Sequence, residues 1–232
     1  MRLEDVHALI TGGGSGIGLA VARAIVAGGG RVAICGRRTE PLDAARAELG
    51  VVAIRGDVSD PEDARRIVAE AAEGLGALDV LVNNAAVGYF APLLETDAAE
   101  MTRVLATNVV GATLVAQECA RRFVPAGRGT IVNVGSTASH RGFERGSAYA
   151  ASKFALSALT ECWRAELRRH GIRVMQVNPS EVQTEFGRGR ARTELDPTRL
   201  VAEDVAHVIV SLLTLPDRGF VTDTTLWATN PR

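Results

Sequence analysis

Short apolar runs alternate along the chain with longer segments in which apolar residues recur at helical spacing. Several of the short runs are continuously apolar, which is typical of parallel strands that are covered on both faces. We therefore predict strands at residues 6–11, 31–35, 51–55, 78–85, 130–136, 172–179 and 219–227.

Helical patterns separate these runs, and cap residues precede two of them. Ser59-Asp60-Pro61 and Thr96-Asp97 stand directly before helical segments, as N-cap residues do. Helices are predicted from the turn after the first strand to about residue 27, and at 41–49, 61–73, 97–123, 149–169 and 202–214. The alternation predicts a single α/β domain over residues 1–232. Its expected fold is a Rossmann-type, doubly wound parallel sheet of about seven strands with helices on both faces.

Composition narrows the class of protein. Hydrophobic residues make up 47% of the 232 residues and aromatic residues 4%, so aliphatic side chains must do most of the packing. A net charge of −1 gives no reason to expect nucleic acid or an anionic membrane as a partner. The three cysteines are far apart and predict neither a metal site nor a disulfide framework. With no apolar run near the ~20 residues of a spanning helix and no signal-peptide pattern, we expect a soluble, cytoplasmic protein.

A glycine-rich turn, TGGGSGIG at residues 11–18, lies between the first strand and the first helix. Glycine permits the tight turn and lets a diphosphate approach the amides at the helix N-terminus. The alternative is a strand–helix turn that needs glycine for steric reasons alone. The turn predicts nucleotide binding by Gly12, Gly14, Ser15, Gly16, Ile17 and Gly18.

The residues at the end of the second predicted strand indicate which nucleotide the chain binds. Gly36 stands where an acidic residue would hold a ribose 2′-hydroxyl, and Arg37 and Arg38 follow it. Two guanidinium groups can grip a 2′-phosphate, which favours NADP(H). A solvated arginine pair is the alternative, so NAD(H) stays open.

Tyr149 and Lys153 are four residues apart, and Lys153 is the only lysine among 26 Lys and Arg residues. At this spacing both side chains face the same way on a helix. A tyrosine ordinarily has a pKa of about 10, and a nearby ammonium, with a cationic nicotinamide, lowers it. The alternative is a surface pair with no chemistry. We interpret the pair as a phenol acid–base group with its ammonium.

Taken with their order and spacing, several motifs resemble the short-chain dehydrogenase/reductase family, in its compact-subunit branch, which includes 3-oxoacyl-carrier-protein reductase-like and carbonyl reductase-like members. These motifs are TGGGSGIG at 11–18, GDV at 56–58, NNAA at 83–86, TNVVG around Asn108, VGS at 134–136, YAASK at 149–153 and NPSEVQT at 178–184. The resemblance implies a catalytic triad of Ser136, Tyr149 and Lys153, completed to a tetrad by Asn108. Tyr149 would be the general acid or base, Ser136 would hold the reacting oxygen, and Asn108 would hold a water that links Lys153 to solvent.

The resemblance also implies cofactor contacts beyond the glycine turn. They are Asp57, Val58, Asn84, Ala85, Tyr149, Lys153, Pro179, Val182 and Thr184. Three departures from the family pattern stand out: Ala86 and Ser180 replace glycines, and the chain end lacks an Asp-Gly-Gly sequence. The last departure weakens an assignment to fatty-acid elongation.

Loop residues around the triad are candidates for the substrate pocket. They are Val87, Tyr89, Phe90, Thr137, Ser139, His140, Phe143, Glu181 and Phe186. Most are small or apolar, which favours a carbonyl compound with a mainly nonpolar body. The polar, glycine-broken stretch around residues 180–200 is predicted to be a substrate flap. Its Arg188, Arg190 and Arg192 are interpreted as solvated, with attraction of a phosphorylated carrier as the alternative.

Together these observations predict an NADP(H)-dependent oxidoreductase that interconverts a small-molecule carbonyl compound and its alcohol by hydride transfer. The family resemblance further implies a homodimer or homotetramer. Alternatives are a cofactor-binding regulatory or sensor protein on the same fold, an NAD(H)-dependent alcohol dehydrogenase, and an epimerase or dehydratase.

Overall fold

The computed structural model describes residues 1–186 and 195–229. Within them, seven parallel strands form one sheet in the order β3-β2-β1-β4-β5-β6-β7. The strands are β1 (His7–Thr11), β2 (Arg31–Gly36), β3 (Val52–Arg55), β4 (Val80–Asn83), β5 (Gly129–Val134), β6 (Ile172–Pro179) and β7 (Asp223–Leu226). The strand order reverses between β1 and β4, where ligands bind in open sheets of this kind. The predicted Rossmann-type fold is confirmed.

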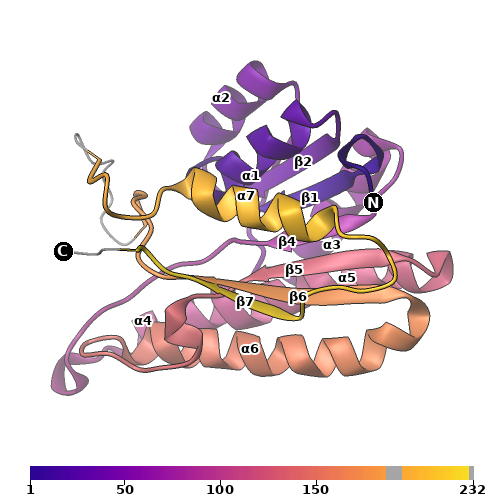
Figure 1. Cartoon of the computed structure of the whole chain (residues 1–232). Coiled ribbons are helices and arrows are strands. Elements are labelled where there is room, and N and C mark those ends of the chain that lie inside the picture. The colour runs from indigo at the N-terminus through magenta and orange to yellow at the C-terminus, as the bar shows by residue number, and fades with distance from the viewer. Residues whose placement is uncertain (187–194, 230–232) are drawn as a thin grey trace.

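Helices cover both faces of the sheet. They are α1 (Gly16–Ala27), α2 (Thr39–Leu49), α3 (Pro61–Leu75), α4 (Ala98–Leu105), α5 (Ala112–Ala126), α6 (Ser147–Leu167) and α7 (Ala202–Leu213). α1, α2 and α7 pack on one face, whereas α3 and α5 pack on the other. Figure 1 shows α1 and α7 on one side of the sheet and α5 and α6 on the opposite side.

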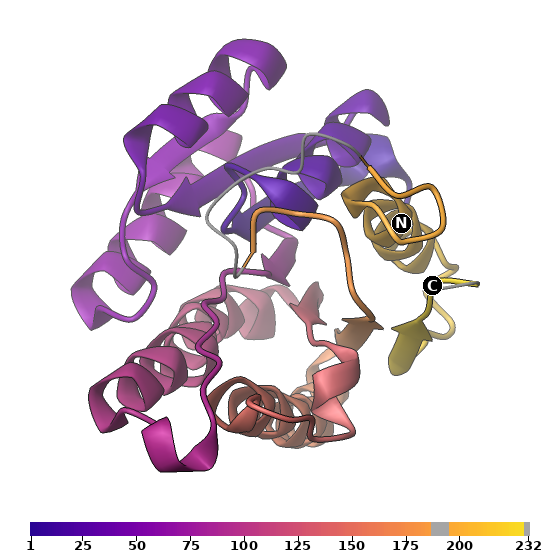
Figure 2. The same ribbon diagram turned by 90° about the vertical axis from the view of Figure 1, so that its left-hand side faces the viewer.

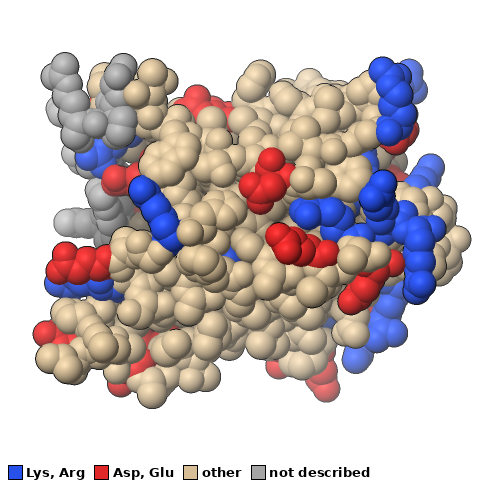
Figure 3. All heavy atoms as spheres, turned by 60° about the horizontal axis from the view of Figure 1, so that its bottom comes forward, with Lys and Arg blue, Asp and Glu red and all other residues tan. Residues whose placement is uncertain are grey.

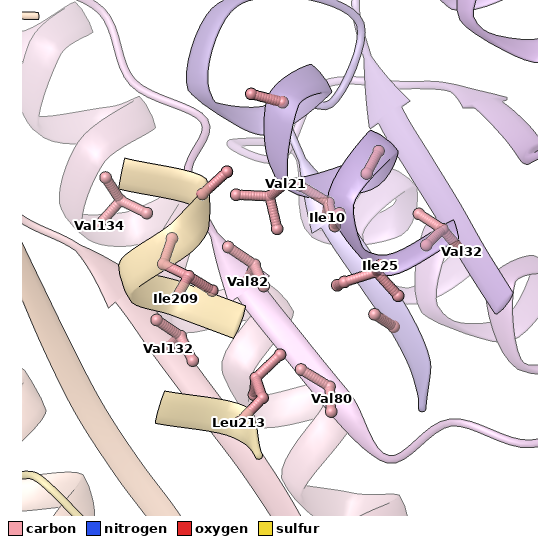
Figure 4. Packing of buried hydrophobic residues seen from close by; sticks show 14 of the residues in the cluster. Ile10, Val21, Ile25, Val32, Val80, Val82, Val132, Val134, Ile209 and Leu213 are labelled. Carbon is pink, nitrogen blue, oxygen red and sulfur yellow. The ribbon is translucent and has the colours of Figure 1, made fainter. Parts of the chain in front are cut away.

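Neighbouring residues of the central strands enter different cores. Ile10 packs with Ile25 of α1 and Ile209 of α7, whereas the adjacent Leu9 packs with Ile67 of α3 and Val115 of α5. Figure 4 shows the first of these cores between the strands and α1 and α7. Both cores exclude water because the central strands β1, β2 and β4 are apolar on both sides, which is why their runs in the sequence do not alternate.

Asp60 and Asp97 cap their helices as predicted. Asp60 accepts hydrogen bonds from the main-chain nitrogens of Glu62 and Asp63, and Asp97 accepts one from that of Glu100. These side chains satisfy N–H groups that have no partner within the helix.

Three predicted elements differ clearly from the structure. The strand expected at 78–85 is shorter, at Val80–Asn83. The long helix expected at 97–123 consists of α4, a π-helical turn (Ala106–Gly111) and α5. The strand expected at 219–227 is shorter, at Asp223–Leu226. It lies at the edge of the sheet, where one side has no neighbouring strand to extend the pairing.

No helix in the described part of the chain is long and apolar enough to cross a membrane. On the face drawn in Figure 3, acidic and basic side chains lie among many uncharged ones. Figure 2 faces the end of the molecule that carries the segment after β6, drawn in orange, and the loop between β4 and α4. The residues predicted to carry chemistry lie mostly at the carboxyl ends of the strands that lead into this end.

Candidate active site

A cleft of about 1150 Å³ runs along the carboxyl ends of the central strands. Its volume exceeds the range of about 300–1,000 Å³ that is usual for drug-sized ligands, so it has room for a longer molecule such as a dinucleotide. The predicted cofactor-binding residues that line it are Gly12, Gly14, Ser15, Gly16, Ile17, Arg37, Arg38, Asp57, Val58, Asn84, Ala85, Tyr149, Lys153, Pro179, Val182 and Thr184.

Gly18 does not line the cleft. A Cβ atom there would lie 2.4 Å from the carbonyl oxygen of Gly12 and 2.6 Å from Nδ2 of Asn84. Gly18 therefore lets α1 pack closely beneath the turn. Gly12 and Gly16 have φ angles of +65° and +53°, which glycine adopts most readily. Asn84 fixes the turn by donating from Nδ2 to the carbonyl oxygens of Thr11 and Gly12.

Arg37 and Arg38 lie at the end of the cleft formed after β2. Their side chains are 54% and 65% exposed. Arg37 Nη1 is 3.8 Å from Asp57 Oδ2, and Arg38 Nη2 is 3.9 Å from Glu185 Oε2. Both separations exceed normal hydrogen-bond length, so these ion pairs are loose and exposed.

Tyr149 and Lys153 stand on the first two turns of α6, inside the cleft. Lys153 is 3% exposed, and its Nζ donates to the carbonyl oxygen of Val134 at 2.7 Å. The same Nζ is 5.7 Å from the centroid of the Tyr149 ring. Burial lowers the pKa of Lys153 to about 8, because a buried ammonium loses its hydration.

The Tyr149 hydroxyl is hydrogen-bonded by the Ser136 side chain, which favours the phenolate, but burial outweighs this contact. Burial raises the pKa of Tyr149 to about 12. In the protein without cofactor, the pKa of Tyr149 is therefore not lowered as predicted from Lys153. The free-energy cost of dehydrating the phenolate is larger than the stabilisation that the neighbouring protein groups give it. A positive charge beside the ring would lower this pKa.

Asn108 lies in the π-helical turn between α4 and α5 and does not line the cleft. Its Oδ1 accepts from the main-chain nitrogen of Val87 at 2.8 Å, and its Nδ2 donates to the Val87 carbonyl oxygen and to Ser152 Oγ. Ser152 Oγ in turn donates to the carbonyl oxygen of Tyr149. Asn108 thus ties the β4–α4 loop to the helix that carries Tyr149.

Asn178 is the first residue of the NPSEVQT motif and has no predicted role, yet it holds the residue that contacts Tyr149. Its Oδ1 accepts from the main-chain nitrogen of Ser136 at 3.2 Å, and its Nδ2 donates to both carboxylate oxygens of Asp223. Gln176 Nε2 donates to the same Oδ1 at 2.7 Å. The signal available in the sequence was the pair of amides, Gln176 and Asn178, at alternate positions of the mostly apolar run of β6.

The predicted pocket residues divide into two groups. Those that line the cleft are Val87, Phe90, Phe143, Glu181 and Phe186, and those that do not are Tyr89, Thr137, Ser139 and His140. The Tyr89 hydroxyl is bound to the main chain of Glu95 and Asp97 instead. Arg188, Arg190 and Arg192 lie outside the described residues. The cleft-lining residues that the sequence reading missed include Pro41, Leu42, Gly88, Arg103, Thr107, Gln183 and Glu185.

Comparison with known proteins agrees with this geometry. The family model described as short chain dehydrogenase matches residues 6–195. A sorbitol dehydrogenase of Cereibacter sphaeroides is 41% identical over 192 residues, which cover 82% of this chain and 75% of that protein. An L-xylulose reductase of Bos taurus is 37% identical over 232 residues, with 96% and 93% covered. An alcohol dehydrogenase from Thermococcus sibiricus, solved with 5-hydroxy-NADP, superposes with a TM-score of 0.88 at 28% identity, covering 97% of each chain.

Proposed function

This chain belongs to the short-chain dehydrogenase family, whose members are oxidoreductases of alcohols and carbonyls, and from that premise we propose an NADP(H)-dependent enzyme that interconverts a ketone or aldehyde and its alcohol. The observation that carries the proposal is the contact between the Ser136 and Tyr149 side chains, one helical turn from Lys153, in a cleft that extends to the glycine turn. The proposed catalytic unit is one domain.

The residues of the cleft fit a nicotinamide dinucleotide. The turn around Gly14 and Gly16 would meet the diphosphate, since main-chain amides at a helix N-terminus favour phosphate oxygens. Asp57 and Val58 would meet the adenine ring, and Thr184 would meet the nicotinamide carboxamide. When bound, this cofactor supplies or accepts the hydride, and its oxidised ring brings a positive charge.

Arg37 and Arg38 support NADP(H) over NAD(H). Both guanidinium groups reach the cleft where the second strand ends, and Gly36 offers no carboxylate to repel a 2′-phosphate. The similar alcohol dehydrogenase solved with 5-hydroxy-NADP is consistent with this preference. Asp57 lies close enough to Arg37 to compete with a 2′-phosphate for its guanidinium group. The preference for NADP(H) would therefore depend on Arg37 and Arg38 acting together.

In carbonyl reduction, the substrate oxygen would accept hydrogen bonds from Ser136 and Tyr149 while negative charge develops on it. Tyr149 would then give its proton to that oxygen, so that ketone, NADPH and one proton become alcohol and NADP⁺. Lys153 would favour the resulting phenolate, and Asn108 would keep α6 and the β4–α4 loop in register. Alcohol oxidation is the reverse of these steps.

Absorbance at 340 nm tests the proposal, followed across a panel of carbonyl compounds and alcohols with NADPH and NADH in parallel. We expect turnover with at least one class and a lower KM for NADPH than for NADH. A chain that binds NADPH but turns over no member of the panel would instead be the cofactor-binding sensor. A lower KM for NADH would overturn the assigned role of Arg37 and Arg38.

A further inference from the structure

Aromatic side chains gather around Tyr149 at the substrate end of the cleft. The centroids of the Phe90 and Phe186 rings each lie 5.6 Å from that of Tyr149, tilted by 56° and 53°. Phe143 extends the group, with its centroid 6.1 Å from that of Phe90. Aromatic residues make up 4% of the sequence, so three phenylalanines beside one tyrosine are a marked concentration.

These three rings remain partly exposed. Phe90 is 37% exposed, Phe143 50% and Phe186 41%, and all three line the cleft. Exposed rings gain little from the hydrophobic effect, so packing alone does not account for large apolar residues at these positions. Exposed apolar surface in a concave site is typical of a surface that an apolar ligand covers.

The rings come from three separate loops that converge on one place. Phe90 lies in the loop between β4 and α4, Phe143 between β5 and α6, and Phe186 after β6. Glycines let them pack closely against the main chain. A Cβ atom at Gly88 would lie 2.8 Å from the Phe90 ring and 3.4 Å from the Phe186 ring, and one at Gly146 would lie 2.5 Å from the Phe143 ring. Each ring is therefore supported on one side.

The charged side chains at this end are paired within the protein. Glu181 Oε1 is 2.7 Å from Arg199 Nη1, and Arg103 Nη2 is 2.6 Å from Glu100 Oε2. A polyhydroxylated substrate would lose hydration at each hydroxyl and would need a partner for it, whereas a ring loses nothing by contact with phenylalanine. The lining therefore suits an apolar body better than a sugar.

We propose that the substrate carries an aromatic ring within one or two bonds of its carbonyl carbon, held by Phe90, Phe143 and Phe186 while the oxygen meets Ser136 and Tyr149. This inference rests on the proposed oxidoreductase function and names its substrate class. The reaction is that of the proposed function, ketone plus NADPH plus a proton giving alcohol plus NADP⁺. Aromatic rings prefer tilted contacts of this kind, so a substrate ring can pack against these phenylalanines in the same way.

Three ketones test the substrate class: 1-phenylpropan-2-one, butan-2-one and L-xylulose. The first two share an unconjugated methyl ketone and differ in the ring, whereas L-xylulose replaces the ring with hydroxyls. We expect kcat/KM to be at least about tenfold higher for 1-phenylpropan-2-one than for either of the others, since one aromatic contact with its buried area reaches that factor. Equal or higher values for butan-2-one or L-xylulose would overturn the inference and leave the oxidoreductase proposal standing.

Variants of the phenylalanines test where the aromatic ring of the substrate binds. Phe90→Ala and Phe186→Ala should each lower kcat/KM for 1-phenylpropan-2-one by a larger factor than kcat/KM for butan-2-one, so that the ratio of the two values falls several-fold. Phe154→Ala is the matched control, because Phe154 is 46% exposed on α6 and does not line the cleft. A loss as large in Phe154→Ala as in the other two would contradict a specific contact.

A binding measurement separates the two proposals. Calorimetric titration of 1-phenylpropan-2-one into the protein with NADP⁺, which cannot reduce the ketone, should give a dissociation constant that Phe90→Ala weakens. Such binding without turnover of any ketone by NADPH or NADH would remove the oxidoreductase proposal and keep the aromatic site. No binding of 1-phenylpropan-2-one would overturn the aromatic site.

Discussion

The side-chain oxygen of Asn178 lies 3.2 Å from the main-chain nitrogen of Ser136 and accepts its hydrogen bond. Asn178 is fully buried, and Asp223 on β7 binds its Nδ2. The carboxylate can only accept, so it turns the amide with its oxygen toward Ser136. A residue of the edge strand thus sets the orientation of the loop that contacts Tyr149.

Replacing Asn178 should affect both stability and catalysis. Asn178→Ala removes a buried acceptor from Ser136, so we expect the free energy of unfolding to fall by about 1–3 kcal/mol. We also expect kcat to fall more than the affinity for NADPH. Asp223→Asn is the control, because its side-chain oxygen can still accept from Asn178. Urea unfolding and steady-state kinetics measure both, and a wild-type kcat in Asn178→Ala would contradict the role.

Tyr149→Phe removes the proposed acid and keeps the ring. We expect kcat to fall by about 10²–10⁴-fold, which is the usual contribution of a general acid or base. The affinity for NADPH, measured by fluorescence titration, should change little, since the ring contacts with Phe90 and Phe186 are kept. A variant that retained activity would exclude Tyr149 from proton transfer.

Lys153 makes the free energy of unfolding increase with pH in the alkaline range, because its pKa is lowered in the folded protein. Its pKa is about 8 in the folded protein and 10.5 is its ordinary value, so between these pH values the unfolded chain holds more protons. The free energy of unfolding should therefore rise with pH across this window, by about 3 kcal/mol relative to Lys153→Met. Tyr149 acts oppositely, but only between pH 10 and about 12, because its pKa is raised.

Urea unfolding of the wild type and Lys153→Met at intervals from pH 7 to 10 measures this difference. We expect Lys153→Met to be the more stable of the two at pH 7, and its advantage to shrink as the pH rises. Parallel curves would mean that the ammonium is not dehydrated in the folded protein.

Arg37→Asp should reverse the cofactor preference. Loss of a charge-assisted contact and gain of a like charge should raise the KM for NADPH by about tenfold to a hundredfold. The KM for NADH should be unchanged or lower. Arg46→Asp is the matched control, since Arg46 is an exposed arginine of α2 outside the cleft. Equal effects on both cofactors would exclude Arg37 from recognition of the 2′-phosphate.

Gly18→Ala tests the packing beneath the turn. Alanine would add helix propensity, but its Cβ would meet the Gly12 carbonyl oxygen and Asn84, which cannot easily move. Overpacking of this kind costs about 1–3 kcal/mol and exceeds the gain of about 1 kcal/mol in propensity. We expect lower stability and weaker NADPH binding. Gly142→Ala has no atom within 4 Å of its new Cβ and should leave both nearly unchanged.

The fold was largely predictable, because strand and helix periods reflect burial on each face. The run at 172–179 matches β6, and Asp60 and Asp97 cap helices as expected. The π-helical turn around Asn108 was not predicted, because it lies within a continuous helical segment and no glycine or proline marks its beginning.

The candidate site was predictable where residues are close in sequence, as Tyr149 and Lys153 are on one helix. Contacts across the sheet were not, because Ser136 and Asn178 are 42 residues apart and meet only through the pairing of β5 and β6. The pKa of Tyr149 was also beyond reach, since it depends on how far the surrounding loops bury the phenol.

The burial of Lys153 has a practical consequence for labelling. Because the sequence has no other lysine, the folded protein offers amine-reactive acylating reagents its terminal amine and hides its one side-chain amine. Intact-mass spectrometry of acylated protein would therefore count molecules in which the first turns of α6 have opened, as those that carry a second acyl group. Acylation of Lys153 thus reports whether the first turns of α6 are folded against the rest of the protein.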